Sequence, residues 1–451
     1  MKVVCIVYNS LMLAGMGVLC PLWVPLVRLR EKYRKTFRRR LWMETLSPEA
    51  RGGASAPTSS TIWIHALSVG EVLSAEPLVE ALARTHGAAN LIFTASTHTG
   101  MQTAQRVIAP HVRAVRHFPY DTLFSVKRAL TVIQPRKVVI VETDLWPNFL
   151  YQLNRCAIPV FLVNARVSGR SYRGYKRIAG VVVPLLSMFS RICVQSARDR
   201  QRFLDLGVPG EKIVLAGNLK FDQSPISVSV SKRERLSAGL GLGADESVWV
   251  AGSTHAHEEA MLGRAYLRIR DAVKGLTLIV APRDPGRATD VCGIFRGQGI
   301  QAVTVAQLEK QARPPGAVVV VDRLGMLRDL YALADVAFVG GSLVKAGGHN
   351  PLEPASVAKP ILFGPYTDDF DWISRTLETA GGAIRIANEI QTAEQVRELM
   401  LSSAKRVRMG SMAHGVFRTH QGAVNRTLDI LDGESGTRCA SLCASEARFG
   451  Q

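Results

Sequence analysis

Between residue 62 and about residue 431, short apolar runs alternate with longer amphipathic stretches, and few folds accommodate such a rhythm. The first amphipathic stretch carries Val72, Leu78 and Leu82 at helical spacing, directly after the apolar run 62–67. Apolar runs of roughly four to eight residues that alternate with helices are typical of strands buried in a parallel sheet. The runs predicted to be strands are 62–67, 91–95, 138–141, 160–163, 191–194, 212–216, 248–251, 276–281, 318–321, 336–339 and 360–363. The chain is therefore predicted to be an α/β protein with parallel sheets.

The series of strands and helices divides into two halves. A chain of 451 residues is longer than one ordinary core requires, and a stretch rich in lysine and serine interrupts the series near its middle. We therefore predict a first domain over residues 61–222, a linker over 223–243 and a second domain over 244–432. Residues 433–451 contain glycine and serine without helical periodicity, and we expect them to form a disordered tail.

The N-terminal segment is strongly apolar. Residues 3–27 contain no charged side chain and are long enough to cross a bilayer. Eight arginines and lysines follow between residues 28 and 40, against Lys2 alone before the segment, so the positive-inside rule places the rest of the chain in the cytoplasm. Residues 1–40 are thus predicted to be a single membrane anchor with a basic flank, either spanning the bilayer or lying deep in its interface. A cleaved signal peptide is the alternative, but the sequence lacks a small-residue cleavage site.

The overall charge predicts an anionic partner. A net charge of +19 is compatible with nucleic acid, acidic lipid headgroups or a phosphorylated substrate. Acidic lipids suit the basic flank of the apolar segment. Nucleic acid is disfavoured because basic and aromatic residues are not interleaved as they are in single-strand binders. A P-loop enzyme is disfavoured as well, since neither GxxxxGKS nor GxxxxGKT occurs.

Residues 340–354, GGSLVKAGGHNPLEP, follow the apolar run 336–339. Glycines at the end of a strand let the main chain approach a ligand, and a helix that opens nearby aims unpaired amides at an anion. Asn350, Pro351, Leu352 and Glu353 place an amide and a carboxylate at that helix start, where proline fits the first turn. The segment suits a nucleotide phosphate, with Glu353 available for ribose hydroxyls. A tight turn between strand and helix is the alternative.

Acidic residues follow two strands of the first half. Glu71 lies at the end of the motif SVGE, where the first strand meets the first helix, at the sheet edge that binds ligands in open α/β folds. The helix dipole is expected to keep Glu71 ionised, and an ionised carboxylate in a partly dry site can accept a proton from a hydroxyl. Glu142 and Asp144 follow another strand and either belong to a site or cap the next helix.

Cationic and imidazole groups follow other strands. Arg166 is a candidate for contacting an anionic group, with a surface salt bridge as the alternative. Lys220 closes the first half and could stabilise the negative charge on a departing phosphate. His255 and His257 lack a third histidine or a cysteine nearby, so no metal site is expected.

Seven motifs occur in order: SVGE at 68–71, ETDLWPN at 142–148, NAR at 164–166, GNLKFD at 217–222, AGSTH at 251–255, APR at 281–283 and GGHNPLEPA at 347–355. Together they resemble the membrane-associated transferases of 3-deoxy-D-manno-octulosonic acid (Kdo) in lipopolysaccharide synthesis, over residues 62–431. The resemblance implies a GT-B glycosyltransferase fold, with two Rossmann-like domains whose parallel sheets face a central cleft, plus an N-terminal membrane-anchor helix. It also implies an enzyme at the cytoplasmic side of the inner membrane, among anionic lipids.

The implied reaction is an inverting transfer of Kdo from CMP-Kdo to the 6-hydroxyl of the lipid A precursor. Members of this family add one or several Kdo units, and the sequence does not indicate the number. Neither a cofactor nor a metal is expected, and nucleic acid is not an expected partner. Another membrane-associated GT-B enzyme with a different nucleotide sugar is the alternative, and a membrane-tethered nucleic-acid binder without enzymatic activity is a more distant one.

The resemblance also assigns roles to single residues. Glu71 matches the catalytic base of the family, while Glu142 and Lys220 match positions that stabilise the transition state. The positions that match CMP-binding residues are Pro282, Arg283, Gly325, Met326, Leu327, Asn350, Pro351, Leu352 and Glu353. Met326 stands where the family has an acidic residue, and Asp284 stands where a histidine is common. Contacts that depend on those two side chains are therefore expected to differ.

Overall fold

The computed structural model describes residues 60–142, 144–222 and 229–433, together with positions 6, 8–10, 12, 14 and 39–41. The predicted anchor over residues 1–40 and the predicted tail over 433–451 therefore lie almost entirely outside the described residues. No helix in this described part of the chain has the length and apolar character needed to cross a membrane.

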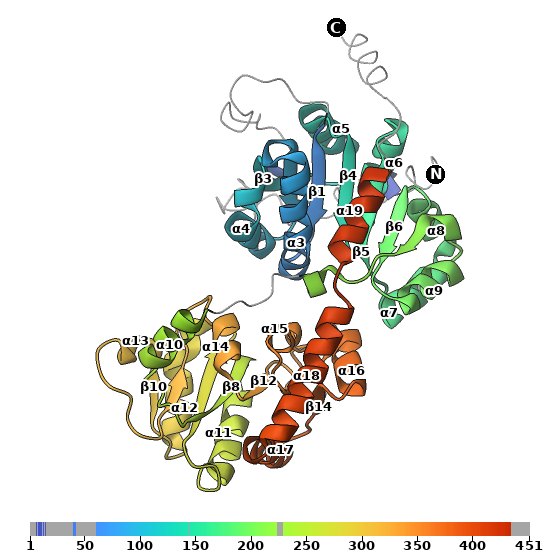
Figure 1. The fold of residues 1–451 in the computed structure, drawn as a ribbon. Coiled ribbons are helices and arrows are strands. Elements are labelled where there is room, and N and C mark those ends of the chain that lie inside the picture. Colours follow the sequence, from blue (N-terminus) through green and yellow to red (C-terminus); the bar gives the residue numbers. More distant parts are fainter. Residues whose placement is uncertain are drawn as a thin grey trace. The chain divides into compact units, whose positions relative to one another are not determined.

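The chain divides into two compact units. The first unit comprises Met1–Gln223 together with Gln421–Gln451, and the second comprises Ser224–His420. Each unit contains one sheet of seven strands, all paired in parallel, with helices on both faces (Figure 1). The predicted α/β class with parallel sheets is confirmed.

The sheet of the first unit has the strand order β3-β2-β1-β4-β5-β6-β7. Its strands are β1 (Ile62–Ala66), β2 (Leu91–Ala95), β3 (Ala114–His117), β4 (Lys137–Val141), β5 (Val160–Ala165), β6 (Arg191–Val194) and β7 (Ile213–Leu215). The helices around it are α3 (Val69–His86), α4 (His98–Val107), α5 (Leu123–Ile133), α6 (Pro147–Arg155), α7 (Gly169–Arg177), α8 (Ala179–Leu186), α9 (Ala197–Asp205) and α19 (Ala423–Gly433), with the short 3-10 helix η5 at Leu219–Asp222.

Helices cover both faces of this sheet, which explains why its central strands are largely apolar. Successive strand residues point to opposite faces, so Trp63 and Ile64 enter different cores. Trp63 packs with Phe149 of α6 in one core, and Ile64 packs with Val72 of α3 in the other. Every residue of β1 and β2 is buried.

The C-terminal helix α19 belongs to the first unit. The carboxylate of Asp222 accepts hydrogen bonds from the amides of Gly422, at 2.6 Å, and Val424, at 2.5 Å, and so caps the helix start. Lys137 on β4 donates to the carbonyl of Leu431 at 2.5 Å. Figure 1 shows α19 beside the sheet of the first unit, and it packs against α3. The predicted second domain, 244–432, therefore ends too late, because its last helix returns to the first unit.

The sheet of the second unit has the order β10-β11-β9-β8-β12-β13-β14. Its strands are β8 (Ser247–Thr254), β9 (Leu276–Pro282), β10 (Ala302–Thr304), β11 (Val318–Val320), β12 (Val336–Val339), β13 (Ile361–Phe363) and β14 (Ala383–Arg385). The helices are α10 (Val230–Gly239), α11 (Glu258–Ile269), α12 (Ala288–Gly297), α13 (Val305–Leu308), α14 (Leu327–Leu333), α15 (Leu352–Ser356), α16 (Asp371–Thr379), α17 (Glu389–Leu401) and α18 (Ser403–Thr419).

The predicted linker 223–243 contains the helix α10 and is not a simple connection. Ser229 caps this helix by accepting the amide of Lys232 at 3.2 Å. The side chain of Lys232 pairs with Asp329 of α14 at 2.7 Å, and the two helices pack together within the second unit. The helix was not predicted because its exposed, polar surface lacks a clear apolar stripe.

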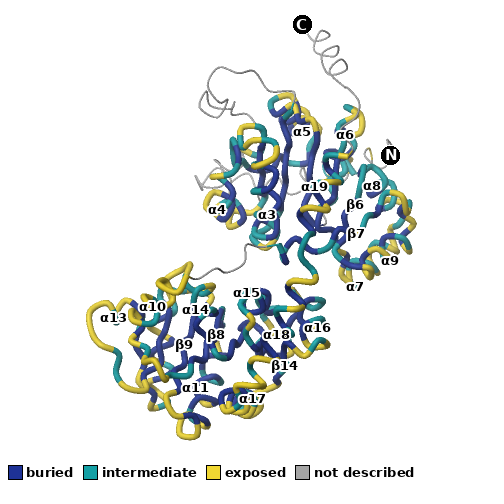
Figure 2. The backbone as a smooth tube through the Cα atoms, viewed as in Figure 1, coloured by how far each residue is buried: buried dark blue, intermediate teal, exposed yellow. Residues whose placement is uncertain are grey.

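Three strands were not predicted from the sequence, and each lies at an edge of its sheet: β3, β10 and β14. These strands have three or four residues and are only partly buried. The central strands β8 and β9, in contrast, are buried over nearly their whole length (Figure 2). Edge strands are covered less completely, so their sequences carry a weaker apolar signal.

Candidate active site

Each sheet has a point at which the order of its strands reverses. In the first unit β1 lies between β2 and β4, and in the second unit β8 lies between β9 and β12. Open α/β sheets bind ligands outside the carboxyl ends of the strands at such points. The loops after β1, β4, β8 and β12 carry most of the candidate residues.

Glu71 lies in the first turn of α3, directly after β1. The amide of Leu67 donates a 2.6 Å hydrogen bond to one carboxylate oxygen, and the hydroxyl of Ser68 donates a 3.3 Å hydrogen bond to the other. Burial, together with the charges of Asp144 and Glu142, raises the pKa of Glu71 to about 8, although the two hydrogen bonds act in the opposite direction. The expectation that the helix dipole keeps Glu71 ionised is therefore wrong. A carboxyl group with a pKa near 8 is instead a strong base once it ionises.

Glu142 and Asp144 lie near Glu71, because their charges contribute to the raised pKa of its carboxyl group. The alternative interpretation was that Glu142 or Asp144 caps α6. Asp121 caps that helix instead, by accepting the amides of Asn148, at 3.1 Å, and Phe149, at 2.8 Å. The structure thus gathers three carboxylates at the carboxyl ends of β1 and β4.

Glu142 is almost fully buried, at 6% exposure, and adopts a left-handed backbone conformation with φ of 68°. Its carboxylate accepts a 3.2 Å hydrogen bond from Nε of Arg166, which follows β5 and is 43% exposed. Arg166 therefore makes a salt bridge, which was the alternative to contact with an anionic ligand. Its guanidinium lies at the three-carboxylate cluster and remains partly accessible.

Lys220 lies in η5, whose backbone amides are held by two asparagine side chains. The amide of Leu219 donates to Oδ1 of Asn164 at 3.1 Å, and the amide of Lys220 donates to Oδ1 of Asn218 at 3.0 Å. Because η5 packs against α3, the structure brings the segment of Lys220 to the helix that carries Glu71.

In the second unit, a carboxylate already occupies the amides of the glycine-rich loop. The fully buried side chain of Glu258 accepts hydrogen bonds from the amides of Gly341, Ser342 and Leu343 at 2.7, 3.0 and 2.9 Å. It also accepts one from the amide of His255 at 2.9 Å. Burial raises the pKa of Glu258, and these four hydrogen bonds oppose that rise.

The amides of Gly341, Ser342 and Leu343 are thus already bonded and are not available to a phosphate. That the helix opening nearby aims unpaired amides at an anion stays a prediction. Gly340 and Gly341 are needed to bring the backbone into place. A Cβ at Gly340 would lie 2.5 Å from the carbonyl oxygen of Ser253, and Gly341 has a φ of 67°. The glycines therefore let the loop close around Glu258, and other groups must attract an anion.

Arg283 and two histidines lie near that loop. Nε2 of His255 and Nε2 of His349 are 2.8 Å apart, and their rings stack. Burial lowers the pKa of His349 to about 4, and the charge of Arg283 contributes to this shift. Arg283 is exposed and follows Pro282, the last residue of β9, with its amide bonded to the carbonyl of Thr254 at 3.0 Å.

Glu353 lies near the same arginine. Its pKa is raised to about 7 by burial, while Arg328 and Arg283 act in the opposite direction. Asn350 accepts the amide of Leu352 at 3.1 Å and so caps α15, which Pro351 precedes. The structure thus groups Arg283, Arg328 and Glu353 in one region of the second unit.

The segment Gly325, Met326 and Leu327 lies at the start of α14, which packs against α15. Gly325 has a φ of 92°, a conformation that favours glycine. Met326 and Leu327 pack against an apolar cluster that includes Leu330. Met326 therefore serves local packing here.

Several residues of these two regions were not predicted as site residues: Glu258, Arg328 and His349. Glu258 is one of two acids at a helix start, a pattern that helix dipoles explain without a site.

The described residues contain no group of three or more His, Cys, Asp or Glu side chains that could hold a metal ion.

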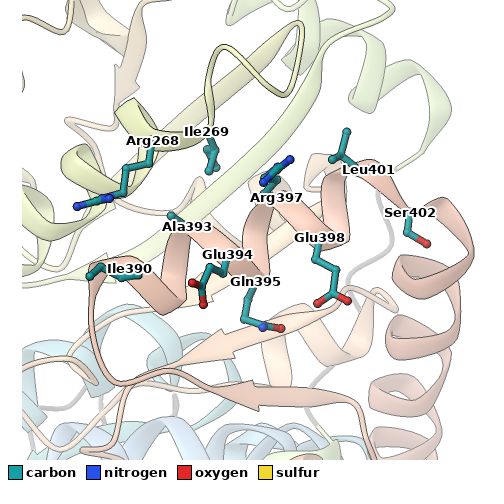
Figure 3. A pocket seen from close by; sticks show the side chains of 10 residues that line it. All are labelled: Arg268, Ile269, Ile390, Ala393, Glu394, Gln395, Arg397, Glu398, Leu401 and Ser402. Carbon is teal, nitrogen blue, oxygen red and sulfur yellow. The ribbon is translucent and has the colours of Figure 1, made fainter.

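A surface groove lies elsewhere in the second unit, between α11 and α17 (Figure 3). Its lining residues are Arg268, Ile269, Ile390, Ala393, Glu394, Gln395, Arg397, Glu398, Leu401 and Ser402. None of the predicted site residues belongs to it, so the groove is separate from the candidate site.

Known proteins resemble this chain over most of its length. Residues 35–223 match the family model for 3-deoxy-D-manno-octulosonic-acid transferase (kdotransferase). The chain is 34% identical over 383 residues to the 3-deoxy-D-manno-octulosonic acid transferase of Haemophilus influenzae, covering 84% of this chain and 88% of that protein. The corresponding transferase of Bordetella pertussis is 28% identical over 434 residues, or 94% of this chain and 98% of that protein.

The fold has solved relatives as well. The crystal structure of UDP-GlcNAc 2-epimerase from Neisseria meningitidis, bound to UDP-GlcNAc, aligns with a TM-score of 0.57 over 83% of this chain and 100% of that chain, at 10% identity. A likeness at this level of identity concerns the fold alone, and it supports the predicted GT-B class. The extent of the match to Kdo transferases decides the family: the chain belongs to the 3-deoxy-D-manno-octulosonic acid transferases and is a glycosyltransferase.

Proposed function

We propose that this protein transfers Kdo from CMP-Kdo to the 6-hydroxyl of the lipid A precursor, with inversion, early in lipopolysaccharide synthesis. The observation that carries the proposal is the setting of Glu71 in a member of the Kdo transferase family. Its carboxyl group lies after β1, beside Asp144 and Glu142, and has a pKa of about 8. Such a group suits a reaction that must take a proton from a sugar hydroxyl.

The chemistry requires few groups. A sugar activated as a CMP ester needs a base for the attacking hydroxyl and positive charge for the leaving phosphate. In the proposed reaction Glu71 accepts the proton as the hydroxyl oxygen attacks the anomeric carbon and the bond to the phosphate breaks. A single displacement of this kind inverts the anomeric centre.

Glu142 and Lys220 are proposed to act on the transition state. Lys220 supplies a cation for the charge that develops on the leaving group. Glu142 acts together with Arg166, to which it is bonded at 3.2 Å. If Lys220 acts mainly on the transition state, Lys220→Ala lowers kcat with little effect on CMP affinity.

The second unit is proposed to hold the CMP part of the donor. Arg283, exposed and close to Glu353, suits the phosphate. Glu353 suits the ribose hydroxyls, and the remaining contacts come from Pro282, residues 325–327 and residues 350–352. This assembly uses no metal and no other cofactor.

The proposed location is the cytoplasmic side of the inner membrane, with residues 1–40 as a single anchor. The net charge of +19 supports this location, because it favours anionic lipids and the phosphates of the acceptor. Detection of residues 1–27 in the mature, membrane-bound protein is the expected result. A mature N-terminus beyond Pro25 would contradict the anchor.

The test is incubation of the purified protein with CMP-Kdo and tetraacylated lipid A precursor, followed by mass spectrometry of the lipid. The expected product is heavier by one or more Kdo residues, and the mass gives their number. CMP should raise the melting temperature, whereas UDP and GDP should not. Absence of product together with stabilisation by UDP or GDP would assign the enzyme to a different nucleotide sugar.

A further inference from the structure

Asn9 carries the one side-chain amide of the apolar run 3–27. In the structure it faces Asn148 at the start of α6, although the two residues are 139 positions apart in the sequence. Nδ2 of Asn9 donates to Oδ1 of Asn148 at 2.8 Å, and Nδ2 of Asn148 donates to Oδ1 of Asn9 at 2.8 Å. A residue of the predicted anchor is therefore bonded to the last residue of the ETDLWPN motif.

Asn148 needs partners within the protein, because its side chain is fully buried. A side-chain amide has two N–H donors and one carbonyl oxygen. In Asn148 one N–H donates to the backbone carbonyl of Asp121 at 2.5 Å, and the other donates to Asn9. Its carbonyl oxygen accepts from Asn9. Without Asn9, one donor and one acceptor of a buried side chain would lose these bonds.

Two further contacts join the N-terminal region to the same part of the first unit. The hydroxyl of Tyr8 donates to the carboxylate of Asp121, which caps α6. Nε of Arg40 donates to the carbonyl of Phe118 at 3.1 Å, in the loop after β3. The carbonyl of Arg40 accepts the amide of Tyr120 at 3.1 Å, and its guanidinium lies 4.2 Å from the centroid of that ring. The described residues near both ends of the predicted anchor thus contact one region of the first unit.

This region adjoins the candidate site. The loop that carries Glu142 and Asp144 runs from the end of β4 to the start of α6, so its two ends are fixed by these elements. Glu142 is bonded to Arg166 at 3.2 Å. Oδ2 of Asp144 lies 3.4 Å from Nε2 of His65, on β1. A shift of the start of α6 would therefore move a loop whose acids lie at the carboxyl ends of β4 and β1.

We propose that Asn9 is a positioning residue, which holds the start of α6 through Asn148 and thereby sets the position of Glu142 for the reaction. Residues 8–10 then form part of the first unit, in addition to any role in membrane attachment. The kinetic part of this inference rests on the proposed function, because Kdo transfer is its readout.

The kinetic test uses the full chain in detergent micelles, so that membrane attachment does not limit the rate. Asn9→Ala should lower kcat about tenfold, because a small displacement of a group that acts on the transition state is costly. KM for CMP-Kdo should stay within about twofold, since the proposed CMP contacts belong to the second unit. Ser10→Ala is the matched control, because Ser10 is the exposed neighbour of Asn9, and its kcat should match that of the wild type. An unchanged kcat in Asn9→Ala, or equal losses in both variants, would overturn the proposal.

A double-mutant cycle tests whether Asn9 acts through Asn148. Asn148→Ala removes the partner, so the double variant Asn9→Ala/Asn148→Ala should have the kcat of Asn148→Ala alone. If the two losses multiply instead, Asn9 acts by another route and the proposal fails.

Hydrogen exchange followed by mass spectrometry depends neither on turnover nor on the folding of Asn148→Ala. In Asn9→Ala, the backbone amides at the start of α6 should exchange about tenfold faster than in the wild type, whereas those of α11 in the second unit should not change. Unchanged exchange at the start of α6 would contradict the proposal. If the wild type transfers no Kdo, the proposed function fails, and the exchange at α6 still decides whether Asn9 holds this helix.

Discussion

Glu71 and Glu258 occupy corresponding places in the two units, yet their surroundings differ. Each lies at the start of the helix that follows the first strand of its unit, α3 after β1 and α11 after β8. Glu258 receives four backbone amides. Glu71 receives one amide and one hydroxyl, and faces two further carboxylates. The fold sets the position of the carboxylate, and the neighbouring loop decides whether its charge is satisfied.

The difference begins in the residues that follow the neighbouring strand. After β12 come Gly340 and Gly341, whose missing side chains let the backbone close around Glu258. After β4 comes Glu142, which adds a negative charge near Glu71. A satisfied carboxylate stabilises structure, whereas a carboxylate among like charges remains available as a base.

The largest expected effect is on catalysis by Glu71→Gln. Loss of a general base should lower kcat by about a thousandfold, while the fold is kept. Kdo transfer measured by mass spectrometry checks this. Glu80→Gln is the matched control, because Glu80 lies on the same helix and pairs with the partly exposed His111, at 3.7 Å. Equal turnover in Glu71→Gln and Glu80→Gln would remove Glu71 from the role of base.

Glu258→Gln should instead destabilise the protein. The new amide group directs its own N–H toward backbone N–H groups, and leaving such buried donors unsatisfied should lower the free energy of unfolding by about 3 kcal/mol. Urea unfolding measures the change. In Glu389→Gln, which removes an exposed pair with Arg264, the loss should stay below about 1 kcal/mol. If both variants unfold alike, the four amide bonds to Glu258 do not stabilise the loop.

Glu258 already occupies the amides of the glycine-rich loop, so Arg283→Ala tests whether Arg283 attracts the phosphate of CMP. We expect CMP to bind about tenfold more weakly, because a charge-assisted contact to phosphate is lost. Isothermal titration with CMP measures the affinity. Arg375→Ala, which removes an exposed arginine paired with Asp371, should bind CMP like the wild type. Unchanged affinity in Arg283→Ala would show that the phosphate is held elsewhere.

A further prediction concerns the pH dependence of stability. In the unfolded chain Glu71 ionises near 4.5, whereas in the folded protein its pKa is about 8. Between these values the folded state keeps a proton that the unfolded state has lost, so this group makes stability fall as pH rises through that window. Glu71→Gln should therefore gain stability relative to the wild type between pH 5 and about pH 8.5. A difference between the two proteins that stays constant over this range in urea unfolding would contradict the raised pKa.

The sequence predicted the central strands because helices bury them on both faces and leave long apolar runs. It did not predict the edge strand β14, whose Arg385 is bonded to Glu378 at 3.1 Å near the surface. The place of α19 was not predictable either, since Asp222 caps it across 200 residues of sequence.

The candidate site shows the same limit. Motifs identified Glu71, Glu142 and Arg283, because acids and cations after strands lie at the ligand-binding edge of the sheet. Nothing local indicates that Glu258 binds amides 83 to 85 residues away. The sequence therefore indicates which groups are present, and the three-dimensional contacts show which of them are already satisfied.

The most direct test of the central comparison is the affinity of Glu71→Gln for CMP. Isothermal titration should give a Kd within about twofold of the wild-type value, because the proposed base belongs to the first unit and the proposed CMP contacts belong to the second. A loss of CMP binding as large as that expected for Arg283→Ala would contradict the account, since Glu71 would then hold the donor.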